Sequence, residues 1–208
     1  MNPWLVIPVK SLRDGKTRLA SALDPVQRRE FMDRLLVHTL DQVAEFPGLD
    51  RTLVVSACSE TRTRAAALGA HALNERGSGL NAALKLAHES VQQRGATQML
   101  VVPCDLPLLR SEDLRYLSRL AMSENIAIAP DRRKHGTNGL CFDSLLDFSF
   151  EFGPDSYARH QHNARRLQRD HAAAISLGLA FDVDTPDDLA EMYERAGYQP
   201  LVDTVAAR

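Results

Sequence analysis

The feature that most constrains the fold of this sequence is a regular alternation of short apolar runs with amphipathic helical segments. The runs expected to form strands are residues 4–9, 53–56, 70–73, 99–102 and 126–130. Helices are expected at residues 25–46, 61–68, 80–93 and 111–122, where apolar residues recur at helical spacing. Strands that alternate with helices form right-handed crossovers, which build a parallel sheet covered on both faces. The sequence therefore predicts an α/β fold with a mostly parallel, doubly wound sheet.

The pattern is looser after Pro130. Phe148, Phe150 and Phe152 alternate within residues 139–152, which suits a half-buried strand or a flap, with core packing as the favoured use. A helix is then expected over residues 155–170, a strand over 173–179, and a last helix with Thr185 as its N-cap. With 208 residues, of which 44% are hydrophobic and 25% charged, the chain is expected to form one domain over residues 1–208.

Composition and charge argue against several classes of function. A formal net charge of −2 gives no broad basic field, so nucleic acid is not an expected partner. No apolar stretch reaches the roughly 20 residues that span a bilayer, and the start of the chain lacks the marks of a signal peptide, so a cytoplasmic protein without membrane contact is expected. The three cysteines are odd in number and widely spaced, which favours reduced thiols.

Three aspartates follow apolar runs. Asp105 ends the run 100–104, while Asp182 and Asp184 close the run 177–183. An acid at the end of a buried strand lies at the carboxyl edge of a sheet, where ligands of open α/β folds bind. Asp182 and Asp184 are two positions apart, so both face the same way in an extended segment and suit a shared Mg²⁺ ion. The alternatives are helix capping by Asp184 and a turn at Asp105.

The polar loop after the first expected strand, residues 10–18, carries four cationic residues. Gly15-Lys16-Thr17 is similar to part of a P-loop, but the position five residues before Gly15 is Lys10, where that motif requires glycine. The loop would therefore meet phosphates with the side chains of Lys10, Lys16 and Arg18. The alternative is a solvated basic loop.

Seven short motifs then occur in an order that covers nearly the whole chain. They are Val9-Lys10, Lys16-Thr17-Arg18-Leu19, Gly79-Leu80-Asn81, Cys104-Asp105-Leu106-Pro107, Gly136 to Leu140, Phe152 to Ser156, and Asp182 to Leu189. In this ordered set the chain resembles the CofC/FbiD guanylyltransferase family. The resemblance implies the fold of nucleotide-diphospho-sugar transferases and MobA-like nucleotidyltransferases. It also implies coupling of GTP to a phosphorylated three-carbon acid, with release of pyrophosphate, in the biosynthesis of the deazaflavin coenzyme F420.

The resemblance also implies residue roles. Asp105, Asp182 and Asp184 would hold Mg²⁺, and Lys16, Arg18 and Asp105 would be the catalytic groups. The nucleotide would contact Lys10, Lys16, Gly79, Leu80 and Asn81. The acceptor acid would contact Thr137, Gly153, Ser156 and Cys104. Because the attacking phosphate is already anionic at neutral pH, alignment and charge neutralisation would carry the reaction, with no general base.

The identity of the acceptor depends on few residues. Cys104 stands where a smaller residue is usual in the family, and on that basis 3-phospho-D-glycerate is the expected acceptor, with phosphoenolpyruvate and 2-phospho-L-lactate as alternatives. His160 and His162 lie close enough in sequence to Ser156 to contact the acceptor, although an exposed or core-edge position is the simpler expectation.

Competing interpretations remain. The Asp182-Val183-Asp184 motif also suits a nucleotide-sugar glycosyltransferase, and a GTP-binding regulator without catalysis would share the fold. The basic run 132–135 is expected to be a solvated loop near an anionic substrate, since base-stacking aromatics are missing. A homodimer is compatible with the phenylalanine-rich stretch 142–152. Lability of a guanylylated product would favour its direct transfer to the next transferase of the pathway.

Overall fold

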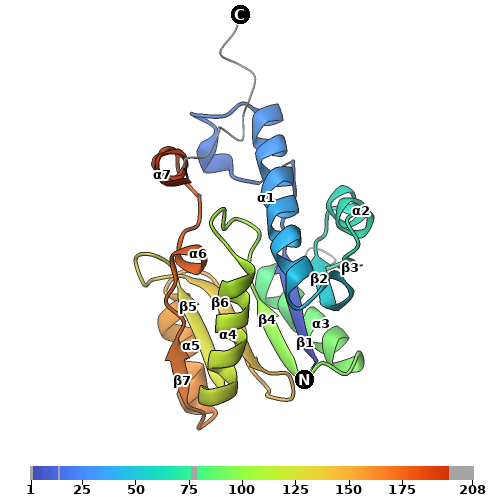
Figure 1. The fold of residues 1–208 in the computed structure, drawn as a ribbon, viewed down its shortest axis with the longest axis vertical. Coiled ribbons are helices and arrows are strands. Elements are labelled where there is room, and N and C mark those ends of the chain that lie inside the picture. The colour runs from blue at the N-terminus through green and yellow to red at the C-terminus, as the bar shows by residue number, and fades with distance from the viewer. Residues whose placement is uncertain (1, 14, 76–78, 197–208) are drawn as a thin grey trace, which may run out of the picture.

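The fold is built on one seven-stranded sheet (Figure 1). The computed structural model describes residues 2–13, 15–75 and 79–196, so parts of the predicted domain, the loop 74–79 and the loop 10–18 lie outside the described residues. The sheet order is β3-β2-β1-β4-β6-β5-β7. The strands are β1 (Pro3–Pro8), β2 (Thr52–Val55), β3 (His71–Leu73), β4 (Gln98–Val101), β5 (Ile126–Pro130), β6 (Thr137–Asp143) and β7 (His171–Ala173).

Most neighbouring strands are parallel. β1 lies between β2 and β4 and is parallel to both, β2 is parallel to β3, and β5 is parallel to β7. Strand β6 is the exception, because it pairs antiparallel with β4 and with β5. The prediction of a mostly parallel α/β sheet is confirmed, and the reversed strand lies in the part of the sequence where the alternation loosens.

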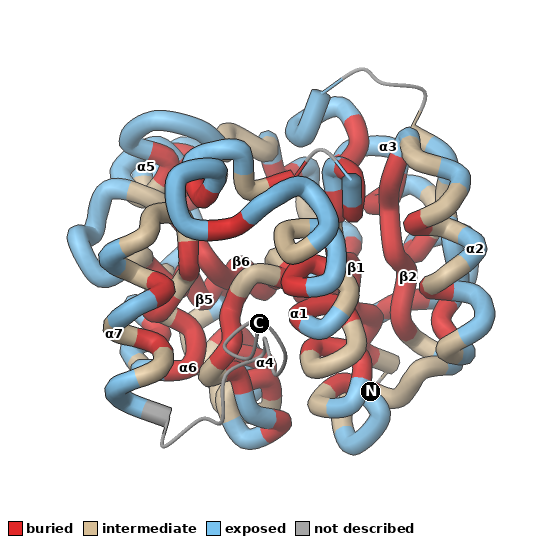
Figure 2. The backbone as a smooth tube through the Cα atoms, turned by 90° about the horizontal axis from the view of Figure 1, so that it is seen from above, coloured by how far each residue is buried: buried red, intermediate tan, exposed pale blue. Residues whose placement is uncertain are grey.

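Helices cover both faces of the sheet. They are α1 (Pro25–Glu45), α2 (Ser59–Ala67), α3 (Leu80–Gln93), α4 (Ser111–Glu124), α5 (Ser156–Arg166), α6 (Leu177–Ala180) and α7 (Pro186–Ala196), with short 3₁₀ turns η1 (Thr17–Leu19) and η2 (Leu49–Arg51). Seen from above, α1 and α4 lie on one side of the sheet and α3 and α5 on the other, with the buried strands between them (Figure 2).

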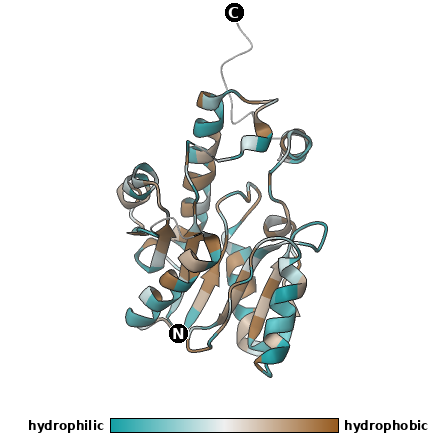
Figure 3. Ribbon diagram, turned by 180° about the vertical axis from the view of Figure 1, so that it is seen from behind, coloured by the Kyte–Doolittle hydropathy of each residue, from teal (hydrophilic) through white to brown (hydrophobic). Residues whose placement is uncertain are grey.

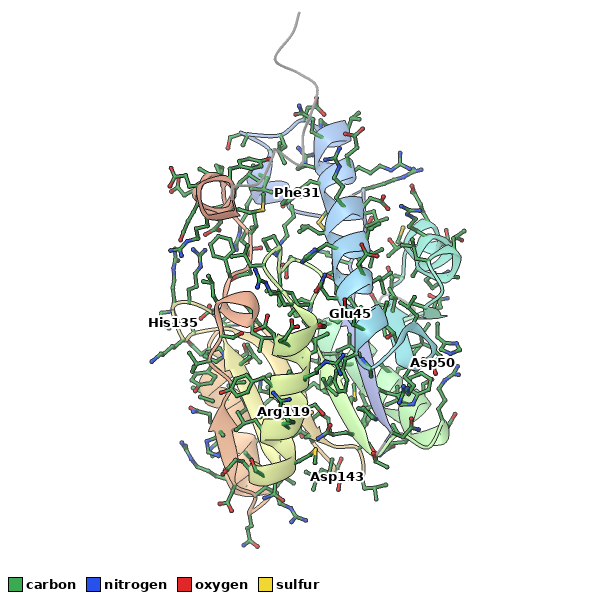
Figure 4. All side chains as sticks on the ribbon, viewed as in Figure 1. Phe31, Glu45, Asp50, Arg119, His135 and Asp143 are labelled. Carbon is green, nitrogen blue, oxygen red and sulfur yellow. The ribbon has the colours of Figure 1, made fainter. Side chains whose placement is uncertain are left out.

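Two hydrophobic clusters follow from this layering. Leu5 and Ile7 of β1 belong to the cluster under α1 and α4, while Trp4 and Val6 belong to the cluster under α3 and α5. Alternate residues of a strand point to opposite faces, so one strand supplies both clusters. In Figure 3 the strands at the centre are largely brown, or hydrophobic, and the outer helices carry many teal, or hydrophilic, residues. In Figure 4 the side chain of Arg119 lies on the outer side of α4, where it is exposed.

Helix α1 begins as the sequence predicts. The Asp24 carboxylate accepts hydrogen bonds from the Val26 and Gln27 N–H groups, and the Gln27 side chain accepts from the Asp24 N–H group. Asp24 and Gln27 thus form a capping box, which satisfies otherwise unpaired backbone donors at the start of the helix. Phe31, fully buried on this helix, anchors its inner face (Figure 4).

Two predicted elements after β6 differ from the structure: the strand is wrong, and the helix is present but shorter than expected. The strand expected over residues 173–179 is divided into β7 and the single turn α6. The chain turns because the Ser176 hydroxyl accepts a hydrogen bond from the Leu179 N–H group at 3.1 Å, which caps a helix. The helix expected over residues 155–170 ends at Arg166, since Gln168 adopts a left-handed backbone at φ 54°.

The phenylalanine-rich segment packs on the core without extending strand β6. Phe148 is buried and stacks on Phe142 of β6 with ring centroids 4.8 Å apart. Phe150 and Phe152 pack partly buried against the same cluster. The expected use in core packing is therefore confirmed. The three cysteines are free thiols, as predicted. No helix among the described residues combines the length and apolar character needed to cross a bilayer.

Candidate functional site

A single backbone contact brings the three predicted aspartates together. The chain leaves β4 at Val101 and reaches Asp105, whose carbonyl oxygen accepts a hydrogen bond from the Val183 N–H group at 3.2 Å. Val183 is fully buried in the core. Its neighbours Asp182 and Asp184 are therefore held beside Asp105, although this segment is not a strand as predicted.

The Lys16 ammonium joins two of these carboxylates. Its Nζ atom donates to Oδ2 of Asp105 and, at 2.7 Å, to Oδ1 of Asp184. The Lys16 side chain is only 8% exposed, against 23% for Asp105 and 41% for Asp184. Arg18 adds a more distant cation, with Nη1 3.7 Å from Oδ2 of Asp184. The basic loop and the acidic edge, far apart in sequence, thus form one site.

The backbone at Lys16 is part of this arrangement. Lys16 adopts the left-handed conformation at φ 53° and precedes the turn η1. A non-glycine residue rarely takes this conformation, which persists only where its surroundings hold it. Here the two carboxylates and the close packing of the preceding Gly15 against Ser11 and Met32 hold the turn.

The carboxylates of the site shift the pKa values of Lys16 and Asp182. Burial opposes the charged form of Lys16, but Asp105 and Asp184 outweigh burial, so the pKa of Lys16 is raised. Burial raises the pKa of Asp182, and the Asp105 carboxylate raises it further, while the Asn138 amide partly offsets both. The site therefore holds an excess of negative charge around a single enclosed ammonium.

The chemistry of these side chains fits a divalent cation. Oδ1 of Asp105 is buried and has no hydrogen-bond partner among the described residues, which leaves a carboxylate oxygen available as a ligand. As the described side chains stand, no three of the His, Cys, Asp and Glu residues form a ready metal centre. The Lys16 ammonium donates to both Asp105 and Asp184 in this arrangement. The Mg²⁺ site stays a prediction, with Lys16 as the group that would have to move.

A second group of predicted residues gathers at β6 and the start of α5. Thr137 is the first residue of β6, and its hydroxyl is 2.9 Å from Nδ1 of His160 on α5. Gly153 has a left-handed backbone at φ 127°, with nothing within 4 Å of the position that a Cβ would take. The Ser156 N–H group donates to the Gly153 carbonyl oxygen at 3.2 Å, which closes the turn at the start of α5.

Asn138 links the acidic and the acceptor sides. Its Nδ2 atom donates to the Asp182 carboxylate and to the Ala180 carbonyl oxygen, both at 3.3 Å. Asn138 follows Thr137 directly on β6, so one strand end contacts both groups. The acidic and acceptor sides are therefore physically continuous.

The residues predicted to contact the nucleoside lie at the start of α3. Gly79 is the N-cap of this helix, at φ 89°, and Leu80 is 43% exposed. The Asn81 amide donates to the Phe152 carbonyl oxygen at 3.1 Å and accepts from the Phe152 N–H group at 2.8 Å. Asn81 thus ties α3 to the acceptor turn. Lys10, predicted for the phosphates, is exposed.

Two predicted residues have surroundings that differ from the expectation. Cys104 is only 4% exposed and packs in the core cluster, where burial raises the pKa of its thiol to about 12. Arg132, in the basic run, is exposed as expected, but it also pairs with Asp188 and Glu191 of α7 and lies over the Phe181 ring at 4.2 Å. Its role in the described structure is to fasten α7.

Comparisons with known proteins identify the family of this chain. The sequence profile described as "Guanylyl transferase CofC like" matches residues 4–196. The chain belongs to this CofC-like guanylyl transferase family. A phosphoenolpyruvate guanylyltransferase from Sphaerobacter thermophilus is 38% identical to it over 201 residues, which cover 97% of this chain and 96% of the relative. Another, from Rubrobacter xylanophilus, is 37% identical over 203 residues, or 96% and 97% of the two chains.

The fold of this CofC-like chain has solved counterparts at low sequence identity. A protein from Desulfovibrio desulfuricans G20 assigned to the nucleotide-diphospho-sugar transferases superposes with a TM-score of 0.77 at 16% identity. The match covers 94% of this chain and 87% of the other. The predicted fold type is confirmed.

Sequence reasoning missed three partners in this CofC-like site. Asn138 lies within a quoted motif but had no assigned role. His160 was expected at a surface or core edge and is instead fully buried. The Asp188 carboxylate accepts hydrogen bonds from the N–H groups of Asp184 and Thr185, so it orients the Asp184 backbone as well as capping α7. The available signal in the sequence was an acidic residue at the third position of the last helix, which is typical of a capping residue.

Proposed function

We propose that this chain transfers the guanylyl group of GTP to phosphoenolpyruvate, with release of pyrophosphate. The observation that carries the proposal is the convergence of Lys16 with Asp105 and Asp184 at one edge of the sheet. Such a site provides both the cation and the carboxylates that phosphoryl chemistry requires. Membership of the CofC-like family supports the guanylyl group and GTP as the donor.

The reaction needs alignment and charge neutralisation more than proton transfer. An oxygen of the acceptor phosphate attacks the α-phosphorus of GTP, and the bond from that phosphorus to pyrophosphate breaks. The acceptor phosphate is anionic at neutral pH, so it attacks without a general base. Lys16 and Arg18 would neutralise the charge of the triphosphate. They would also hold it so that the attacking and departing oxygens lie in line.

The carboxylates are proposed to hold Mg²⁺. Asp105, Asp182 and Asp184 supply the oxygen ligands that Mg²⁺ prefers, and the unpaired Oδ1 atom of Asp105 supports this role. When bound, the ion would supply Lewis-acid stabilisation of the phosphate oxygens. Lys16 would then give up its two carboxylate bonds and donate to the phosphates instead. The same ammonium would thus stabilise the site before the substrate binds and the substrate afterwards.

The acceptor is proposed to bind at Thr137, Gly153 and Ser156. A hydroxyl and backbone N–H groups at a glycine turn and a helix start favour an anion. Phosphoenolpyruvate is preferred over 3-phospho-D-glycerate for two reasons. The relatives at 37–38% identity are named phosphoenolpyruvate guanylyltransferases. The residue on which the 3-phospho-D-glycerate expectation depended, Cys104, is buried in the core.

The proposal is tested by supplying GTP and Mg²⁺ with phosphoenolpyruvate, 2-phospho-L-lactate or 3-phospho-D-glycerate and measuring pyrophosphate release. Release is expected to be fastest with phosphoenolpyruvate and to fall at least 100-fold in Asp105→Asn, with GTP binding measured separately. A preference for another acid would overturn the choice of acceptor. GTP binding without pyrophosphate release with any of the three acids would favour a regulator, and release of free nucleoside diphosphate from an added nucleotide sugar would favour a glycosyltransferase.

Family membership also supports a place in coenzyme F420 biosynthesis. A guanylylated enol phosphate contains a reactive phosphoanhydride, so a transferase that uses it promptly is the expected next partner.

A further inference from the structure

The buried imidazole of His160 has a defined environment that the reaction above does not use. It is fully buried on α5, in contact with the rings of Phe148 and Phe152 at centroid distances of 5.7 and 4.8 Å. A polar ring in such surroundings requires hydrogen-bond partners on its nitrogens. The structure supplies one for each, and the two partners belong to the two parts of the proposed acceptor site.

The hydrogen-bond partners determine the tautomer. The Glu151 N–H group donates to Nε2 of His160 at 3.1 Å, so Nε2 carries no proton. A neutral imidazole with an unprotonated Nε2 has its proton on Nδ1. Nδ1 therefore donates to the Thr137 hydroxyl oxygen, 2.9 Å away. Burial keeps the ring neutral, because it lowers the pKa of His160 to about 4.

The direction of this bond determines what Thr137 offers to a ligand. A hydroxyl has one proton and two lone pairs, and His160 uses a lone pair. The proton of the Thr137 hydroxyl is thus left for an acceptor other than His160. An outward O–H donor suits an anionic oxygen of the acceptor, whereas the opposite tautomer would use that proton inside the core.

His160 also holds the chain that leads into the acceptor turn. Its bond to the Glu151 N–H group is one of several side-chain contacts that hold residues 149–152. Asn163, one turn further along α5, donates to the Ser149 carbonyl oxygen at 2.8 Å. Asn81 bonds both backbone groups of Phe152. The segment that leads to Gly153 is therefore held independently of His160 at two points.

We propose that His160 is a positioning residue for the acceptor acid, which fixes the Thr137 hydroxyl as an outward donor to the acceptor's phosphate or carboxylate. The proposal rests on the acceptor role given to Thr137 above. His160 itself does not reach the substrate, because its two nitrogens are occupied and its ring is enclosed. Its effect is expected in acceptor binding and not in GTP binding.

Two amide variants separate the two nitrogens. In His160→Asn the amide nitrogen takes the place of Nδ1 and still donates to Thr137. In His160→Gln the amide oxygen takes the place of Nε2 and still accepts from Glu151, but the donor to Thr137 is lost. His160→Gln is expected to raise the KM for the acceptor about tenfold, the effect of one lost hydrogen bond. His160→Asn is expected to stay within about threefold of wild type, and the KM for GTP to stay unchanged in both.

A double-mutant cycle distinguishes positioning from a general structural effect. In the Thr137→Val background, His160→Gln should raise the acceptor KM no further, because the hydroxyl that it positions is gone. Equal effects in both backgrounds, or a wild-type acceptor KM in His160→Gln, would overturn the proposal. A cooperative unfolding transition and an unchanged GTP KM show that a variant is folded.

The tautomer is measured without any substrate. Long-range ¹H–¹⁵N spectra of ¹⁵N-histidine-labelled wild-type protein, assigned by the loss of one signal in His160→Gln, should show a neutral ring protonated at Nδ1. A ring protonated at Nε2 overturns the proposal even if the variants fold poorly. If none of the three acids is turned over but the Nδ1 tautomer is found, the proposed function fails and the hydrogen-bond assignment stands.

Discussion

Replacing Lys16 with methionine is the sharpest test of the site's electrostatics. The change keeps an unbranched apolar stem of similar length and removes only the ammonium. In the wild type, this ammonium donates to Asp105 and Asp184 while Asp182 lies nearby with a raised pKa. Without it, three carboxylates face one another with no enclosed cation. The variant should therefore be less stable in a chelator, and more responsive to divalent cations, than the wild type.

The expected loss of stability follows from how the pair is buried. Removing one partner of a buried ion pair costs about 3–5 kcal/mol because the other charge is left uncompensated. Asp105 is 23% exposed and Asp184 41%, so solvent screens part of this penalty. We expect the free energy of unfolding to fall by about 2–3 kcal/mol, between the values for buried and exposed pairs. For a chain of this size that is roughly 5–10 °C in Tm.

The pH dependence of this contribution is also defined. The pKa of Lys16 is raised above 10.5, so its stabilising effect is fully present below pH 10.5 and is lost only as the pH rises further. The difference between wild type and Lys16→Met should consequently be constant from about pH 7 to 9. A difference that disappears within this range would contradict the assignment of the ion pair.

Thermal unfolding in EDTA and in Mg²⁺ gives the measurement, with Lys10→Met as the matched control. Lys10 is exposed on the same loop, so its loss should change Tm by less than about 1 °C. Mg²⁺ should raise the Tm of Lys16→Met more than that of the wild type, since the ion replaces the missing charge. An equal Tm for the two variants in EDTA would refute the reasoning about burial. An equal Mg²⁺ response in wild type and Lys16→Met would refute the location of the ion.

Three further outcomes are expected. Asp182→Asn should raise Tm at pH 7 in EDTA, because a raised pKa means that the ionised carboxylate destabilises the fold at every pH above that pKa. Urea unfolding of the wild type should show a stability contribution from His160 that is complete above pH 6.5 and is lost as the pH falls through about 4, reaching about 3 kcal/mol; His160→Gln should lack it. Among the thiols, Cys58 should be alkylated first, as followed by mass spectrometry. Burial would raise its pKa, but hydrogen bonds to Thr61 and its neighbours outweigh burial and lower it, whereas burial raises the pKa of both Cys104 and Cys141.

The first 130 residues were predictable because local signals agree there. Each apolar run is short, each helix has a clear start or stop, and the alternation admits few topologies. Asp24 and Pro25 show this well, since an Asp at the N-cap and a Pro at the first helical position predict a helix start that the structure contains. Strand β6 was harder, because its direction depends on β4 and β5 as partners and not on its own residues.

The segment around Asp182 and Asp184 shows a correct site in a wrongly predicted element. Its apolar residues suggested a strand, but Ser176 begins a helical turn that uses up residues 177–180. The predicted alternation of side chains is nevertheless present. Val183 is buried in the core, and the acids on either side of it are only partly buried. Alternation predicts facing side chains wherever the chain is extended, whether or not it pairs with a neighbouring strand.

The interaction between the basic loop and the acids could not be derived from either motif alone. The sequence assigned the cations of the loop to phosphate and the aspartates to a metal ion. An enclosed cluster of like charges is unstable, however, until a group of opposite charge neutralises it. Before substrate binds, Lys16 and the carboxylates neutralise each other, which accounts for the low exposure of the ammonium and the strained backbone that delivers it. Binding of GTP with a divalent cation would replace these contacts. The carboxylates would then contact the cation, and Lys16 would contact the phosphates. Because each charged group would keep a partner of opposite charge, the electrostatic energy of the site would change little. The binding energy of the substrate would then be available to align the phosphates.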